Sequence, residues 1–299
     1  MFQKLFRHNT IQCMILPEWL KVKKPPIGKS IAVNKIIKRH QLHTVCQNAR
    51  CPNIFECFAK GTATFLILGD TCTRYCRFCS IKKLKPMGTI NQPSDEPQKV
   101  ARACKEMKLK HIVITSVTRD DLPDGGASIF YETILEVKEV CPDITIEVLT
   151  PDFQGKEESI NKVVSAEPDI FNHNIETVPR LYTEIRPLAD YKRSLKLLSS
   201  VKHLNQNITT KSGLMLGLGE EKDEIINVMI NLRKVNCDVI TMGQYLRPSL
   251  NNKTLEVKRF IPPEEFYFYR QKAYELGFKA VASGPFVRSS YAAEELFKT

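Results

Sequence analysis

Two groups of three closely spaced cysteines are the residues of this sequence best suited to chemistry. The first group is Cys72, Cys76 and Cys79, spaced Cys-x3-Cys-x2-Cys, with the aromatic Phe78 just before the last cysteine. Three thiolates without a fourth cysteine in register do not suit structural zinc, which takes four closed ligands. They suit a four-iron cluster that leaves one iron open to a substrate or cofactor. The spacing therefore predicts a reactive iron–sulfur centre.

The second group is Cys46, Cys51 and Cys57, spaced Cys-x4-Cys-x5-Cys. Alone, this spacing is compatible with a zinc knuckle or with no metal site, but its position just before the first group favours a second cluster. Such clusters indicate metal or redox chemistry in a reducing compartment rather than disulfides. The other cysteines are scattered singly, and the last three are expected to be small buried apolar residues: Cys13, Cys104, Cys141 and Cys237.

The first cysteine group, with its aromatic residue and a predicted strand at 63–68 before it, resembles the motif of the radical S-adenosylmethionine superfamily. The resemblance implies that the open iron binds the amino and carboxylate groups of the methionine moiety. It also implies that one electron from the cluster cleaves S-adenosylmethionine to methionine and a 5′-deoxyadenosyl radical, so that S-adenosylmethionine is consumed as a co-substrate.

The second cysteine group is similar to that of the lipoyl synthase family. A Leu-His-Thr-Val run at 42–45 and a Cys-Pro-Asn-Ile-x-Glu-Cys pattern at 51–57 match this family. The chain departs from the family at Gln47 and Asn48, where acidic residues are usual, but neither is a ligand. Further matching motifs extend the resemblance over about residues 17–295. They lie at 114–126, 172–179, 186–187, 211–213, 243–246 and 284–291.

Membership of this family implies a sulfurtransferase that inserts two sulfur atoms at C6 and C8 of a protein-bound octanoyl-lysine to form the lipoyl group. It implies two 4Fe-4S clusters, the second supplying the sulfur. The implied partners are octanoylated lipoyl domains of 2-oxoacid dehydrogenases, or the glycine-cleavage carrier protein, and a reduced donor such as ferredoxin or flavodoxin. A biotin synthase-like or methylthiotransferase-like enzyme would share the first cysteine group but does not predict the second group or the C-terminal motif.

The resemblance also implies a fourth ligand for the second cluster. It is a serine oxygen from the Arg-Ser-Ser-Tyr motif at 288–291, and we favour Ser290 over Ser289. In the Gly-x-Met-x-Gly-x-x-Glu stretch at 213–220, Gly213 and Gly217 would let the backbone approach the adenine closely. An ordinary barrel strand with a helix cap explains these glycines as well.

Other residues are expected to contact S-adenosylmethionine. The backbone N–H groups of Gly125 and Gly126 would bind the methionine carboxylate, unless this pair only turns the chain. Asn174, Glu176 and Arg186 lie where hydrogen bonds to the ribose and carboxylate are expected. Structural pairing within the fold explains these three residues equally well.

Alternating strand and helix patterns predict the elements that position these residues. Strands are expected at 63–68, 111–117, 144–149, 169–175, 209–216 and 238–243, and helices at 95–108, 127–140, 156–165, 191–205 and 222–235, followed by a helix at 263–276 and a short strand at 279–283. This α/β alternation fits a doubly wound sheet or a barrel. We predict a partial (β/α)6 TIM-like barrel at 61–283, an N-terminal extension at 1–60 and a C-terminal extension at 284–299.

The charge of the chain is unevenly distributed. The net charge is +11, but residues 1–43 hold nine basic residues against one acidic residue. This arm is either a solvated segment or a docking strip for an acidic partner. No apolar run is long enough to span a bilayer, and paired zinc spacing and RNA-binding aromatic motifs are missing. We therefore expect no membrane or nucleic-acid partner, and a cytoplasmic location in a bacterium or an organelle stroma or matrix in a eukaryote.

Overall fold

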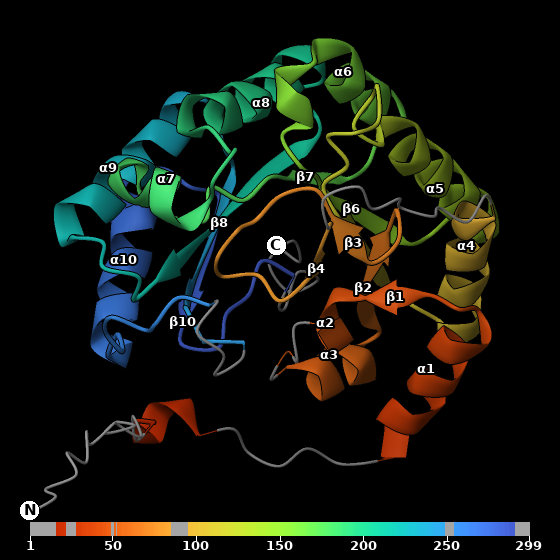
Figure 1. Cartoon of the computed structure of the whole chain (residues 1–299), viewed down its shortest axis with the longest axis horizontal. Coiled ribbons are helices and arrows are strands. Elements are labelled where there is room, and N and C mark those ends of the chain that lie inside the picture. Colours follow the sequence, from red (N-terminus) through yellow and green to blue (C-terminus); the bar gives the residue numbers. More distant parts are fainter. Residues whose placement is uncertain are drawn as a thin grey trace, which may run out of the picture.

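Parallel strands that alternate with amphipathic helices form an open barrel in the structure, a computed structural model that describes residues 16–21, 28–48, 51, 53–84, 95–248 and 254–290 (Figure 1). Its parallel strands pair in sequence order: β2 (Thr62–Ile67), β5 (His111–Ser116), β6 (Thr145–Leu149), β7 (Ile170–Asn172), β8 (Thr209–Leu216), β9 (Val239–Gln244) and β10 (Ala280–Gly284). All residues of β2 and β9 are buried, as expected for parallel strands covered on both faces.

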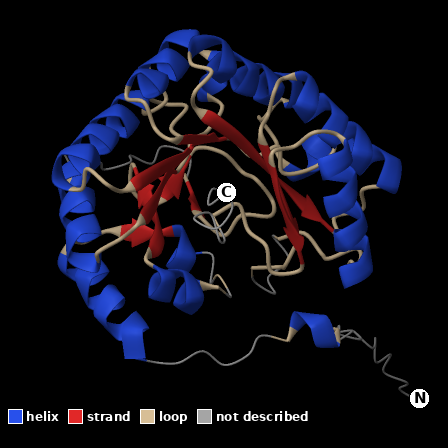
Figure 2. Cartoon of the chain, turned by 180° about the vertical axis from the view of Figure 1, so that it is seen from behind, coloured by secondary structure: helices blue, strands red, loops and turns tan. Residues whose placement is uncertain are grey.

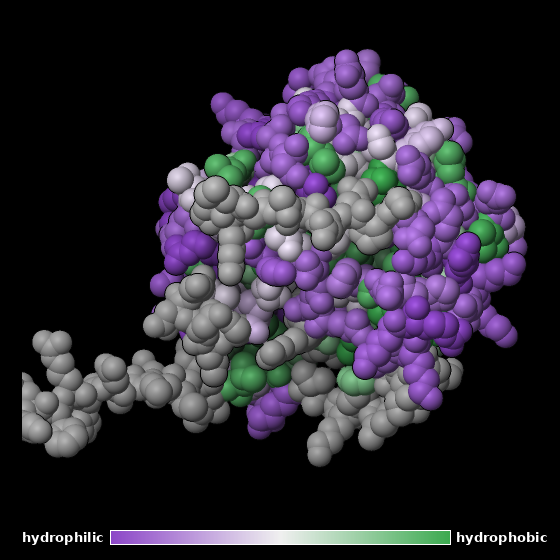
Figure 3. Space-filling model, turned by 45° about the vertical axis from the view of Figure 1, so that its right-hand side comes forward, coloured by the Kyte–Doolittle hydropathy of each residue, from purple (hydrophilic) through white to green (hydrophobic). Residues whose placement is uncertain are grey.

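Helices cover the outside of this sheet, as Figure 2 shows. They are α4 (Glu96–Met107), α5 (Ala127–Val140), α6 (Glu157–Ser165), α8 (Tyr191–Leu204), α9 (Lys222–Lys234) and α10 (Pro263–Glu275). Helix α9 shows why they pack there: it buries Ile225, Val228, Met229 and Leu232, whose i, i+3, i+4, i+7 spacing forms one apolar stripe. The exposed sides of the helices are mostly hydrophilic in Figure 3.

The N-terminal extension closes one edge of the sheet. Helix α1 (Gly28–Arg39) leads to β1 (His43–Thr44), which pairs antiparallel with β2 through His43 opposite Leu66. Two short helices follow, α2 (Val45–Asn48) and α3 (Ile54–Lys60). The remaining short elements are η1 (Glu18–Leu20), β3 (Thr71–Cys72), β4 (Lys82–Lys83), η2 (Phe153–Gly155), η3 (Pro179–Leu181) and α7 (Tyr182–Ile185).

The predicted partial barrel with extensions is confirmed, with two differences of detail. The short strand predicted at 279–283 is a full member of the sheet, because β10 pairs in parallel with β9. The strand predicted at 169–175 ends at Asn172, and Glu176 rejoins the sheet only as an isolated bridge to Leu214. The backbone φ angle of Glu176 is +67°, which interrupts the extended conformation of the strand.

Two stretches of the basic arm, 1–15 and 22–27, lie outside the described residues, and the first of them contains Cys13. Of the other scattered cysteines, Cys104 and Cys237 are buried as predicted, whereas Cys141 is partly exposed. Within the described residues, no helix is both long and apolar enough to cross a membrane.

A buried charge pair crosses the inside of the barrel between β8 and β6. Lys211 Nζ lies 3.0 Å from both carboxylate oxygens of Glu147, and both side chains are fully buried. Asn172 Nδ2 donates to Glu147 Oε1 at 2.8 Å, and His111 Nε2 lies 3.4 Å from Glu147 Oε2. Burial alone would raise the pKa of Glu147, but Lys211 and His111 hold it below its usual value. The barrel therefore depends on Lys211 to neutralise this carboxylate.

Replacing Lys211 with methionine should destabilise the protein by about 3–5 kcal/mol, because it leaves a buried carboxylate without its cation. The loss is measured by denaturant unfolding, with Lys196→Met, which removes an exposed pair with Glu157, as the control. Because folding lowers the pKa of Glu147, the ion pair stabilises the folded protein fully above the unfolded-state pKa of about 4.3. The difference in unfolding free energy between the wild type and Lys211→Met should therefore shrink as the pH falls below that value. If Lys211→Met and Lys196→Met lost the same free energy of unfolding, the stabilising role assigned to the Lys211–Glu147 pair would be contradicted.

Candidate functional site

The first cysteine group lies on the loop that leaves the carboxyl end of β2, the edge at which parallel α/β folds place their chemistry. Cys72 is in β3, and its Sγ accepts backbone N–H groups from Arg74 at 3.4 Å and Thr118 at 3.3 Å. Thr73 N donates to Thr118 O at 3.0 Å, and Arg77 N donates to Ile185 O at 2.9 Å. The loop is therefore tied to segments that follow β5 and β7.

Arg74 is the main anchor of this loop. Its Nε donates to Asp120 Oδ2 at 2.7 Å, and one terminal nitrogen donates to Asp152 Oδ1 at 2.5 Å. The guanidinium is buried; burial alone would lower its pKa, but the two carboxylates raise it above its usual value. Sequence analysis missed this residue, because its partners lie 46 and 78 positions away.

Cys72 is buried, whereas Cys76 and Cys79 are partly exposed and have cations that act on their thiols. Burial raises the pKa of Cys76, while Arg186 and Lys83 act to lower it. Burial also raises the pKa of Cys79, again opposed by Lys83. Phe78 is partly buried against the core. Bare thiolates are therefore unfavourable at Cys76 and Cys79, and binding of a metal centre by these thiols would release protons.

The second cysteine group lies on the N-terminal extension. Cys46 is in α2 and Cys57 in α3, and Cys51 N donates to Cys46 O at 3.0 Å. The pKa of Cys57 is raised to about 12, first by burial and then by the nearby Cys46 and Cys51. The three sulfurs are therefore close enough to interact, and the extension forms a second thiol-rich site.

The two cysteine loops adjoin one another. Ser80 Oγ, one residue after the first group, donates to Asn48 O at the end of α2 at 2.9 Å. Among the described residues, no three His, Cys, Asp or Glu side chains converge on a point that would hold a single metal ion. A four-iron cluster does not need such convergence, because each thiolate binds a different iron.

The C-terminal segment reaches both the second cysteine group and the barrel. Asn53 Nδ2 donates to Phe286 O at 2.7 Å, and the charge of Arg288 acts to lower the pKa of Cys51. Ser289 Oγ accepts a hydrogen bond from Asn174 Nδ2 at 2.7 Å. Within the described residues, no hydrogen bond engages the Ser290 side chain, whose role as a ligand stays a prediction.

Asn174, Glu176 and Arg186 come together at the carboxyl end of β7. Asn174 Nδ2 donates to Glu176 Oε1 at 3.1 Å, and Arg186 donates to the carbonyls of Asn174 and Ile175 at 3.0 and 3.1 Å. Burial raises the pKa of Glu176, and Arg186 opposes this shift. Two polar atoms, Asn174 Oδ1 and Arg186 Nε, are buried without a hydrogen-bond partner among the described residues. Such orphaned groups are typical of a site that binds a polar ligand.

Gly213 and Gly217 each leave space for a different neighbouring group. A Cβ on Gly213 would lie 2.7 Å from Asn174 Oδ1, so this glycine makes room for the Asn174 side chain. A Cβ on Gly217 would lie 2.3 Å from Gln244 Nε2 and 2.4 Å from Arg259 O. The close approach at Gly217 is therefore to the chain itself, which favours the structural explanation over contact with adenine.

Gly125 and Gly126 form the turn before α5, both with positive φ. Their N–H groups are already used: Gly125 N donates to Leu122 O at 3.1 Å, and Gly126 N donates to Asp124 Oδ1 at 2.9 Å. This pairing favours the turn explanation over binding of the methionine carboxylate.

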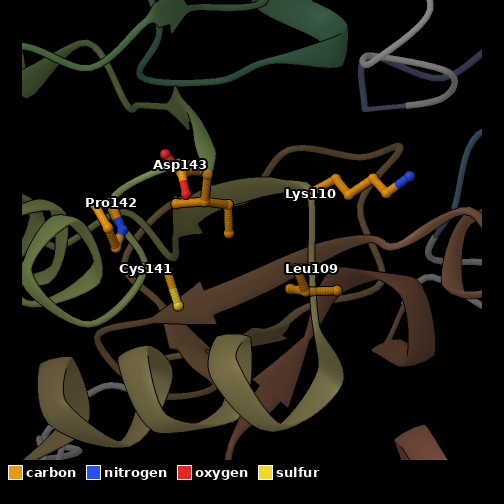
Figure 4. A pocket seen from close by; sticks show the side chains of 6 residues that line it. Leu109, Lys110, Cys141, Pro142 and Asp143 are labelled. Atoms are coloured by element: carbon orange, nitrogen blue, oxygen red, sulfur yellow. The ribbon is translucent and has the colours of Figure 1, made fainter.

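Two cavities lie at opposite edges of the barrel. A cavity of about 410 Å³ is lined by Leu109, Lys110, Cys141, Pro142, Asp143 and Ile144, just before β5 and β6 begin (Figure 4). It is at the amino edge of the sheet, away from both cysteine groups. A cavity of about 320 Å³ lies at the carboxyl edge, between Leu181 and Ile185 on one side and Leu218 and Leu255 on the other.

The donor set fits a 4Fe-4S cluster with S-adenosylmethionine beside it. The thiols of the first cysteine group lie at the carboxyl edge, and the charge of Arg186, whose Nε is orphaned, acts on the Cys76 thiol. A model of the radical SAM superfamily matches residues 66–232, more than half of the chain. Fold, site and match together define a radical S-adenosylmethionine enzyme.

Curated relatives define the family further. The chain is 55% identical over 281 residues to a lipoyl synthase of Caldanaerobacter subterraneus, covering 93% of this chain and 95% of the relative. It is 52% identical over 280 residues to a lipoyl synthase of Haemophilus influenzae, covering 93% and 86%. The chain belongs to the lipoyl synthase family. Similarity over this length decides against the biotin synthase-like and methylthiotransferase-like alternatives.

Solved structures support the fold. Streptococcus suis SuiB bound to S-adenosylmethionine superposes with a TM-score of 0.53 at 13% identity, covering 83% of this chain and 57% of that one. HydG, a maturase of the FeFe-hydrogenase, gives a TM-score of 0.52 at 13% identity, covering 83% and 56%.

Replacing Gly213 with alanine should weaken S-adenosylmethionine binding about 10-fold, because the new methyl group displaces the Asn174 side chain. Affinity is measured by equilibrium dialysis on the anaerobically purified protein. Ser283→Ala is the control, since it removes only the bond from Ser283 Oγ to Phe266 O at 2.8 Å, away from Asn174. Unchanged affinity in Gly213→Ala would remove Asn174 from the binding site.

Proposed function

We propose that the two cysteine groups divide the work of the lipoyl synthase reaction, which inserts two sulfur atoms into an octanoyl chain carried by a lipoyl domain. The observation that carries this proposal is the contact of the two groups at the barrel edge, where Ser80 joins Asn48 at 2.9 Å. A radical formed beside the first group and a sulfur source at the second can then act on one substrate chain.

Cys72, Cys76 and Cys79 are the proposed ligands of the catalytic cluster. A 4Fe-4S cluster held there supplies the electron that cleaves S-adenosylmethionine to its 5′-deoxyadenosyl radical. Arg74 keeps the loop in place through Asp120 and Asp152. The backbone N–H groups of Arg74 and Thr118 donate to Cys72 Sγ and fix its orientation.

Asn174, Glu176 and Arg186 are the proposed polar contacts of S-adenosylmethionine. Asn174 offers its orphaned Oδ1 and Arg186 its orphaned Nε, while Glu176 holds the Asn174 amide in orientation. Gly213 contributes by leaving space for Asn174. Gly125 and Gly126 contribute the turn before α5, and Gly217 the packing against Gln244.

Cys46, Cys51 and Cys57, with Ser290 as the fourth ligand, are proposed to hold a second 4Fe-4S cluster whose sulfide is a substrate of the insertion. A hard oxygen matches iron less well than a thiolate does. The Ser290 corner is therefore the one that opens most readily. Arg288 lies beside Cys51, where its charge offsets that of the thiolates.

The wider setting is also part of the proposal. The carriers are lipoyl domains of 2-oxoacid dehydrogenases or the glycine-cleavage carrier protein, and the electron comes from reduced ferredoxin or flavodoxin. Free cysteine groups of this kind require a reducing compartment, for which we propose the bacterial cytoplasm, without membrane or nucleic-acid partners. We assign residues 1–60 and 284–299 to the second site and 61–283 to the radical barrel.

Mass spectrometry of an octanoylated lipoyl domain tests the function. After anaerobic incubation with the protein, a strong reductant and S-adenosylmethionine, the domain should gain the mass of two sulfur atoms, as the dithiol. Oxidation of that dithiol to the disulfide after the reaction should then remove the mass of two hydrogens. Omitting S-adenosylmethionine is the control and should give no gain. A domain that keeps its octanoyl mass while 5′-deoxyadenosine accumulates would contradict the assigned substrate.

Triple alanine variants should separate the two cysteine groups. Replacing Cys72, Cys76 and Cys79 should abolish 5′-deoxyadenosine formation and roughly halve the iron content. Replacing Cys46, Cys51 and Cys57 should also halve the iron but leave cleavage intact, while no thiolated product forms. Chromatography of 5′-deoxyadenosine and iron analysis measure both effects. Lipoyl formation by the second variant would rule out this group as the sulfur source.

A further inference from the structure

The segment from Gly284 to Ser290, which we call the tail, is fixed at several points on the barrel and on the second cysteine group. Asn53 Nδ2 donates to Phe286 O at 2.7 Å, and Gln244 N donates to Pro285 O at 3.3 Å. A Cβ on Gly243 would lie 2.0 Å from Val287 O, so β9 admits the tail only because it carries glycine there. The tail thus spans from β9 to the loop that holds Cys51.

The end of the tail is fixed by Asn174. The Asn174 amide nitrogen carries two hydrogens, and it donates to Glu176 Oε1 at 3.1 Å and to Ser289 Oγ at 2.7 Å. Its Oδ1 has no partner among the described residues. One rigid amide group therefore presents its oxygen to the proposed S-adenosylmethionine site and its nitrogen to the tail.

We propose that Ser289 is a positioning residue that couples S-adenosylmethionine binding to the placement of the tail, and through it to the next residue, Ser290. The inference rests on the proposed function, in which Asn174 contacts S-adenosylmethionine and Ser290 is a ligand. A ligand that donates a hydrogen bond to Asn174 Oδ1 restrains rotation of the amide. Because the amide is planar, the same restraint fixes Nδ2 and strengthens its hold on Ser289.

The size of the effect follows from the single hydrogen bond that carries it. One such bond contributes about 0.5–1.5 kcal/mol, which corresponds to a change of about two- to tenfold in an equilibrium constant. S-adenosylmethionine should therefore slow opening of the tail by this factor at most. The coupling works without movement of the barrel strands, since Asn174 lies two residues beyond the end of β7.

Amide hydrogen exchange on the anaerobic holoprotein, without reductant so that no cleavage occurs, tests the coupling. In the wild type, S-adenosylmethionine should slow exchange at 286–290 about two- to tenfold. Ser289→Ala should abolish this ligand-dependent slowing, and Ser289→Thr, which keeps the hydroxyl, should retain it. Ser283→Ala is the matched control: it removes the bond from Ser283 Oγ to Phe266 O at 2.8 Å, outside the tail, and should retain the slowing.

Two results would overturn the coupling. One is ligand-dependent slowing in Ser289→Ala equal to that of the wild type, and the other is its loss in Ser283→Ala as well. A merely structural role for Ser289 would change exchange equally with and without S-adenosylmethionine. If S-adenosylmethionine protects neither the tail nor residues 72–79 and 172–176 of the wild type, the proposed binding site itself is wrong. Protection at the latter two segments without protection of the tail rejects the coupling alone.

Discussion

The buried guanidinium of Arg74 holds together the loops on which the rest of the site depends. Parallel strands bring their carboxyl ends to one edge, but the loops that leave them are not held by strand pairing. Arg74 joins the loop after β2 to Asp120, after β5, and to Asp152, after β6. A buried arginine between two carboxylates has fixed geometry, because the planar fork directs each hydrogen bond. The loop that carries the first cysteine group is therefore held firmly on the barrel.

Burial and charge act together on the thiols of both groups. Burial raises the pKa of Cys76, Cys79 and Cys57, so none of these sites favours bare thiolates. Each group nevertheless has a cation nearby: Arg186 acts on the first group, and Arg288 on the second. The protein thus supplies partial compensation, and the metal centre proposed at each group would supply the rest.

Features encoded by short spacings could be predicted from the sequence, and features made by distant residues could not. Short spacings in the sequence predicted both cysteine groups, the barrel strands and the helices. Arg74 was missed because nothing near it in sequence marks its partners. The same limit applies to Gly217, which resembles a ligand-contact glycine but whose missing side chain makes room for Gln244 and Arg259. Sequence alone also could not show that Ser289 faces Asn174, 115 positions earlier.

The placement of the second cysteine group has a mechanical consequence for a cluster that gives up its sulfur. Cys46 and Cys57 lie on two short helices outside the parallel barrel, and the extension joins the sheet through the two-residue strand β1. The barrel is held by other means, including the full burial of β2 and β9 and the Lys211–Glu147 pair. The extension is not loosely attached, because Val33, Ile37 and Phe58 are buried in the same apolar core as the barrel strands. Under the proposed function, loss and rebuilding of the second cluster would therefore leave the radical site in place, since Arg74 fixes that site on the barrel.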